Sequence, residues 1–75
     1  MAKLPRITGK EVVKALQKAG FTHIRTRGSH CYLYHYGKDR LVTVPAHSGK
    51  TLAPKTLKSI LGQASLDIGE LKEFL

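Results

Sequence analysis

The first regular pattern in the chain is an apolar stripe at helical spacing, placed directly after a capping motif. Thr8 and Glu11 have the spacing of a capping box, in which each side chain accepts a hydrogen bond from the other residue's backbone N–H. The apolar positions on the stripe are Val12, Val13, Leu16 and Ala19. Gly20 stands where a helix typically ends. The pattern predicts a helix from the Thr8 cap to about Ala19.

A hairpin is predicted next, because two runs rich in Thr, Ile, Tyr and Leu flank the dipeptide Gly28-Ser29. A two-residue loop that begins with glycine is typical of a type II′ turn between antiparallel strands. The predicted strands cover about residues 21–27 and 30–36. With this loop, the opposed residues are Arg27 and His30, Thr26 and Cys31, Arg25 and Tyr32, Ile24 and Leu33, and His23 and Tyr34.

This register sorts the hairpin side chains onto two faces, because successive residues of a strand point to opposite sides. The face that is predicted to meet the core carries Ile24, Thr26, Cys31 and Leu33. The other face carries His23, Arg25, Arg27, His30, Tyr32 and Tyr34. The hairpin therefore presents imidazole, guanidinium and aromatic groups together on one face.

The remaining elements complete a small α+β domain. A turn at 37–39 leads to a third strand at 41–44, which ends before Pro45 because proline cannot donate to a strand ladder. After a loop at 46–51, Pro54 suits the first turn of a second helix. Its apolar stripe is Leu57, Ile60, Leu61 and Ala64. A last short helix, capped by Ser65 or Asp67, is predicted to run through Phe74.

The order αβββα, plus the terminal helix, predicts one domain over residues 1–75. Helices that flank a three-stranded antiparallel meander pack most simply on one face of it and leave the other face bare. The apolar face of the hairpin and third strand is the one to be covered. His30 and the tyrosines are therefore expected on the uncovered face.

Charge is the strongest feature of the composition. The 75 residues include 13 Lys and Arg against 5 Asp and Glu, a net charge of +8. This excess predicts a polyanionic partner, and a surface that serves only solubility is the alternative. Cys31 is the single cysteine, which excludes an internal disulfide. No apolar run approaches the roughly 18 residues of a membrane span, so we expect a soluble cytoplasmic protein with no membrane partner.

The acidic and sulfur-containing residues do not have the pattern of a metal centre. Three of the five acids lie in the last nine residues, and Glu11 is predicted to serve as a cap. The four histidines and the cysteine lack the spacing of a zinc site. We therefore expect neither a metal nor another cofactor.

His30 is the residue to which a reaction can be assigned. RNA carries its own nucleophile, the 2′-hydroxyl, and its attack on the adjacent phosphate needs proton transfer and positive charge. An imidazole transfers protons at neutral pH, because its ordinary pKa is about 6.5. Arg25, Arg27 or Lys50 could supply the charge. From spacing alone, an ordinary surface role for His30 stays open.

Several other residues also allow two interpretations. His47, beyond Pro45, is either a second proton donor or a simple loop residue. Tyr32 and Tyr34 either stack unpaired bases or are ordinary strand formers. His23 and His35 are predicted to be structural. For the whole chain, the alternatives to an RNA-cleaving enzyme are a small RNA-binding module without catalysis and a protein that chiefly binds an acidic partner.

The chain resembles the HicA family of toxin mRNA interferases, the toxin half of HicA–HicB toxin–antitoxin pairs. The resemblance covers nearly the whole length and rests on the order and spacing of several motifs. They are Thr8-Gly9-Lys10-Glu11, Ala19-Gly20-Phe21, Arg27-Gly28-Ser29-His30, Val42-Thr43-Val44-Pro45-Ala46-His47, Gly49-Lys50 and Leu57-Lys58-Ser59-Ile60-Leu61. The resemblance implies a fold like that of double-stranded-RNA-binding domains, in agreement with the predicted order of elements.

The resemblance also implies a function and a site. It implies metal-independent cleavage of single-stranded RNA, in particular mRNA, and neutralisation by a HicB-type antitoxin protein. It makes His30 catalytic, with Gly28 and Ser29 shaping the turn before it. The residues expected to bind RNA are Arg25, Arg27, Tyr32, Tyr34, His47 and Lys50. The family often has a second histidine after the catalytic one, where this chain has Cys31, which the register points inward.

Overall fold

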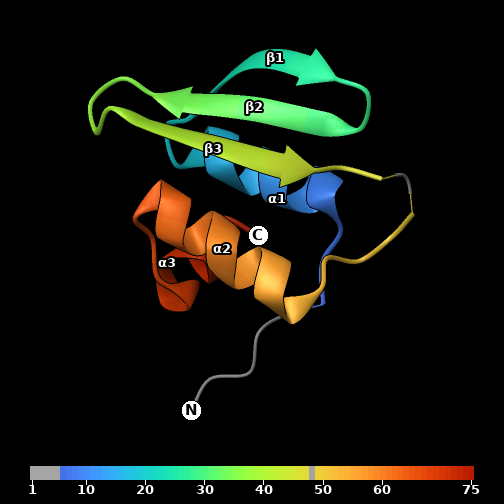
Figure 1. The fold of residues 1–75 in the computed structure, drawn as a ribbon. Helices are drawn as coiled ribbons and strands as arrows, with labels where there is room; N and C mark the ends of the chain where they lie inside the picture. Colours follow the sequence, from blue (N-terminus) through green and yellow to red (C-terminus); the bar gives the residue numbers. More distant parts are fainter. Residues whose placement is uncertain (1–5, 48) are drawn as a thin grey trace.

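The computed structural model describes residues 6–47 and 49–75, and its elements follow the predicted order (Figure 1). They are α1 (Gly9–Lys18), β1 (Thr22–Arg27), β2 (His30–His35), β3 (Arg40–Pro45), α2 (Pro54–Ala64) and α3 (Ile68–Glu73). The α+β fold class of the sequence analysis is therefore confirmed, and the fold is consistent with that of double-stranded-RNA-binding domains. Residue 48 of the predicted loop and the first five residues of the predicted domain lie outside the described residues.

The three strands form one antiparallel sheet in the order β1-β2-β3. The helices lie on one side of this sheet, and no element of the described chain covers its other face (Figure 1). Leu33, Val42 and Val44 point toward the helices and are fully buried. The helices supply the other half of the core through Val12, Leu16, Leu57, Ile60 and Leu71, among others. The sheet therefore has a buried inner face and an open outer face.

The predicted boundaries need small corrections. The first helix ends at Lys18, with Ala19 as its C-cap, and Gly20 adopts a φ of 105° just beyond it. Asp67, and not Ser65, caps α3; Ser65 instead ends α2 in the left-handed conformation. Helix ends commonly differ by one or two residues, because the last turn depends on local capping contacts. Within the described residues, no helix combines the length and the apolar character that crossing a bilayer requires.

The hairpin register is correct near the turn and wrong beyond Arg25. The structure pairs Arg27 with His30, Thr26 with Cys31 and Arg25 with Tyr32, as predicted. A β-bulge then intervenes, so that His23 pairs with Leu33 and Thr22 with Tyr34. An extra residue in one strand moves every residue beyond it to the opposite face.

The bulge reverses the predicted positions of two side chains. Ile24, predicted in the core, is 48% exposed. His23, predicted on the cationic face, now belongs to the inner-face register, where its Nε2 lies 2.7 Å from Thr26 Oγ1. Thr26 itself is exposed, because the helices lie under β2 and β3 and leave the edge strand β1 uncovered (Figure 1). Phe21, just before β1, is buried at 3% exposure and fills the core at this corner.

Helix α1 begins with the capping box that the sequence predicts. The Glu11 N–H donates to Thr8 Oγ1 at 3.2 Å, and the Thr8 N–H donates to Glu11 Oε1 at 3.0 Å. These bonds hold the pKa of Glu11 below its ordinary value of 4.5, chiefly through the Thr8 backbone N–H. Because the folded-state pKa is lowered, this stabilisation is complete above about pH 4.5 and is lost as the pH falls through the folded value.

We expect the Thr8→Ala variant to be less stable by about 1 kcal/mol, because it leaves the N–H of Glu11 without its acceptor. For a domain of this size, that loss lowers the melting temperature by roughly 4–8 °C. Thermal unfolding at pH 7, followed by circular dichroism, measures the change. A melting temperature equal to that of the wild type would show that the cap contributes nothing.

Candidate functional site

The outer face of the sheet is organised in rows of residues that pair across the three strands. One row is Arg27, His30 and Pro45, and the next is Arg25, Tyr32 and Thr43. These rows alternate with the rows of the buried residues Leu33 and Val44, so they point away from the helices. His30 is exposed, and so are both arginines. The structure therefore brings an accessible imidazole and two guanidinium groups together at one end of the open face.

The turn before His30 depends on one glycine. Gly28 has a φ of 57°, and Ser29 has no positive φ, as in the predicted type II′ turn. A Cβ on Gly28 would meet no atom within 4 Å, so the requirement for glycine is conformational and not steric. This turn places Ser29 and His30 at the tip of the hairpin.

Two contacts join the hairpin tip to the segment that follows β3. The Ala46 N–H donates to the Ser29 carbonyl oxygen at 2.6 Å. The Ser29 hydroxyl lies 3.3 Å from His47 Nε2. These contacts hold His47 beside Ser29. Because Ser29 directly precedes His30, the two histidines lie near the same hairpin tip although they are 17 positions apart in the sequence.

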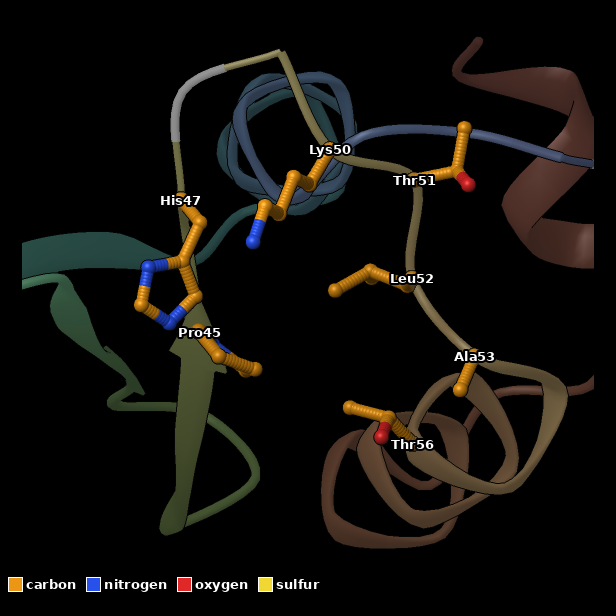
Figure 2. A pocket seen from close by; sticks show the side chains of 7 residues that line it. All are labelled: Pro45, His47, Lys50, Thr51, Leu52, Ala53 and Thr56. Atoms are coloured by element: carbon orange, nitrogen blue, oxygen red, sulfur yellow. The ribbon is translucent and has the colours of Figure 1, made fainter.

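His47 and Lys50 also belong to the wall of a pocket of about 170 Å³ (Figure 2). Both residues were predicted from the sequence as separate candidates, whereas the other residues of the lining were not: Pro45, Thr51, Leu52, Ala53 and Thr56. These residues come from the end of β3, the loop after it and the first turn of α2. Because the lining comes from several elements, the spacing of residues along any one helix or strand could not predict this pocket.

The tyrosines occupy different environments. Tyr32 lies beside Arg25 in its row and is half-buried. Tyr34 donates a hydrogen bond from its hydroxyl to the Asp39 carboxylate, which raises the pKa of this phenol. Its ring meets Tyr36 edge to face, with 4.8 Å between the ring centroids. Tyr34 is therefore anchored at the end of the sheet that is opposite the hairpin tip, since β2 runs from His30 to His35.

The other two histidines make local contacts, as their predicted structural role requires. His23 Nε2 lies 3.0 Å from the Arg25 carbonyl oxygen. His35 accepts a hydrogen bond from the Lys38 N–H at 3.0 Å through Nδ1. Its ring also packs edge to face against Phe21, with 5.0 Å between the centroids.

The acidic side chains of this basic chain are mostly engaged within it. Glu11, Asp67 and Glu70 belong to capping boxes, and Asp39 accepts the hydrogen bond from Tyr34. In residues 6–47 and 49–75, no three His, Cys, Asp or Glu side chains are grouped as metal ligands would be. The exposed arginines of β1 and Lys50 therefore dominate the charge near the hairpin tip, and an anion is the favoured ligand there.

Comparison with models of protein families gives a match. The model of a family described as "HicA toxin of bacterial toxin-antitoxin" matches residues 9–66. No curated protein is significantly similar to the chain. The matched range contains the hairpin, the segment after β3 and the whole of α2.

Proposed function

The chain belongs to the HicA toxin family of bacterial toxin–antitoxin systems, and from this membership we propose that it is a metal-independent endoribonuclease that cleaves mRNA. The observation that carries the proposal is the position of His30. Its exposed imidazole lies in one row with Arg27, at the edge of an uncovered, cationic sheet face. We propose that residues 1–75 form one RNA-cleaving domain.

The proposed reaction uses the nucleophile that RNA itself carries. A 2′-oxygen loses its proton and attacks the adjacent phosphorus, and the bond from phosphorus to the 5′-oxygen breaks as that oxygen gains a proton. The products are a 2′,3′-cyclic phosphate and a 5′-hydroxyl. His30 is the catalytic residue, because its imidazole can exchange protons with these oxygens at neutral pH. Arg27 and Arg25 lie beside it and offset the charge that builds on the phosphate.

The rest of the proposed RNA interface surrounds this centre. Gly28 and Ser29 set the turn that presents His30. Tyr32, in the next row, offers a ring on which an unpaired base can stack, and Tyr34 extends this surface along β2. His47 lies next to Ser29, and Lys50 lines the same pocket as His47. We propose that a HicB-type antitoxin inhibits the toxin by covering this cationic face.

Purified protein incubated with a single-stranded RNA in the presence of EDTA tests the proposed reaction. We expect cleavage to continue in EDTA and to leave 2′,3′-cyclic phosphate and 5′-hydroxyl ends, which mass spectrometry identifies. The matched control is the same RNA with 2′-O-methyl groups, which lacks the nucleophile and should stay intact. Products with 5′-phosphate ends would contradict the mechanism. RNA that binds but stays intact would favour a non-catalytic RNA-binding module.

A further inference from the structure

The pocket beside His47 lies near His30, because the two share a neighbour in Pro45. One of its walls is Pro45, which pairs directly with His30 across β2 and β3. Neighbouring strands lie about 4.8 Å apart, so the backbones of Pro45 and His30 are adjacent, and the pocket lies on the far side of Pro45, between the end of β3 and the first turn of α2. An RNA strand that places a phosphate at His30 and continues across the end of β3 would bring a neighbouring nucleotide to this pocket.

The lining of the pocket combines apolar and polar groups. Leu52 and a side-chain carbon of Thr56 point into the space, and the Pro45 ring faces them (Figure 2). The volume is about 170 Å³, and an apolar cavity of about 150 Å³ is known to hold a benzene-sized ring. The pocket therefore has the size and lining for one planar six-membered ring with polar groups at its edge, which describes a pyrimidine base.

The polar part of the pocket is its rim. The ammonium group of Lys50 points into the space beside His47 (Figure 2). An ammonium group donates hydrogen bonds and accepts none. It therefore suits the edge of uracil that carries the carbonyl oxygen at C4. Cytosine has an amino group at C4 instead, which is itself a donor.

We propose that this pocket binds one unpaired nucleobase next to the cleaved phosphodiester, and that Lys50 makes it prefer bases with a carbonyl oxygen at that edge. The proposal rests on the proposed RNA cleavage for its substrate, and it adds a specificity-determining residue. The shape of the pocket selects an unpaired base, and the donor at its rim selects among the bases.

Binding to a protein that does not cleave provides the test. In the His30→Ala background, we would measure the fluorescence anisotropy of labelled oligo(U) and oligo(C), two pyrimidine strands that differ in the carbonyl or amino group at this edge. We expect oligo(U) to bind about tenfold more tightly. The Lys50→Met change removes the donor and keeps the apolar stem, and it should abolish this difference by weakening oligo(U) binding more than oligo(C) binding.

Two further variants distinguish the effect of the pocket on RNA binding from the effect of net charge. Lys38→Met removes an equal charge in the turn between β2 and β3, and the preference for oligo(U) should persist. Ala53→Leu partly fills the pocket and leaves Lys50 in place, and it should weaken oligo(U) binding. Equal loss of affinity for both strands in Lys50→Met would mean that this lysine contacts a phosphate, which would overturn the proposal. Equal or unmeasurable binding of the two strands before this change would overturn it as well.

The binding test and the cleavage test can fail independently. If wild-type protein does not cut RNA, but Lys50 still determines the preference for oligo(U), the nuclease proposal fails and the base pocket stands. If the protein cuts RNA and no preference depends on Lys50, the pocket proposal fails and the nuclease stands.

Discussion

Substitution of His30 by alanine is expected to lower the rate of RNA cleavage by a factor of about 10²–10⁴, the usual contribution of a positioned acid–base group. The methyl group of alanine cannot carry the proton between the 2′-oxygen, solvent and the departing 5′-oxygen. The charge supplied by Arg25 and Arg27 remains, so RNA affinity should change little. Single-turnover cleavage of a labelled RNA, with excess protein, measures the rate without a contribution from product release.

The stability of the His30→Ala protein should be close to that of the wild type. His30 is exposed, and surface substitutions usually change stability by no more than about 0.5 kcal/mol. His23→Ala is the matched control, because His23 is also an exposed histidine of the hairpin, and its Nε2 lies within hydrogen-bond distance of Arg25 and Thr26 of its own strand. It should cleave at nearly the wild-type rate. Full activity in a folded His30→Ala protein would reject the catalytic assignment.

Growth of a bacterial host offers the same comparison in a cell. Induction of the wild-type chain should stop growth and degrade mRNA, whereas induction of His30→Ala should do neither. Equal toxicity of the two proteins would show that the arrest does not depend on this imidazole.

The sequence predicted the elements that local chemistry determines. The capping box of α1, the glycine that opens the hairpin turn and the proline that begins α2 each act within a few residues. The face of β2 and β3 was also predictable, because the alternation that buries Leu33 and Val42 extends over both strands. These features account for the correct order of elements and for the exposed position of His30.

The bulge at Ile24 could not be predicted in the same way. No Gly or Pro marks it, and a regular strand would place Phe21 and Ile24, three positions apart, on opposite faces, so the sequence does not show which of them enters the core. The deciding fact is tertiary: the helices cover β2 and β3, while β1 lies at the uncovered edge, so Ile24 would gain little burial in the predicted register (Figure 1). Phe21 occupies the available core position instead.

The pocket was missed for a related reason. His47 and Lys50 were recognised by residue type, but Pro45, Leu52 and Thr56 become neighbours only when the end of β3 and the start of α2 meet. The contact that fixes this region, from Ala46 to Ser29, joins residues 17 positions apart. Long-range contacts of this kind leave no periodic signal, so a single sequence indicates the chemistry of the site better than its shape.

Gly9→Ala is expected to be the most damaging of the small substitutions that we consider, because Gly9 packs directly against the backbone at the end of β3. A Cβ at this position would overlap the carbonyl oxygen of Pro45 and would lie 2.7 Å from the Ala46 Cα. Backbone atoms cannot rotate away as a side chain can, so α1 and this segment would have to separate. Overpacking of this kind typically costs about 1–3 kcal/mol.

The displacement should also reach the proposed site. Ala46 donates to Ser29, and His47 follows it, so a shift of this segment disturbs the contacts beside His30. We therefore expect Gly9→Ala to lower both the urea midpoint of unfolding and the rate of RNA cleavage at 25 °C. Loss of activity with an unchanged urea midpoint would be inconsistent with a packing effect.

Gly62→Ala is the matched control, since it adds the same methyl group to another helical glycine. Gly62 is exposed in α2, and a Cβ there would meet no atom within 4 Å. Alanine favours a helix interior over glycine by up to about 1 kcal/mol, so this variant should be more stable than the wild type. The same chemical change is thus expected to move the urea midpoint in opposite directions at the two sites. Equal shifts in both variants would show that helix propensity, and not the contact of Gly9 with Pro45, determines the outcome.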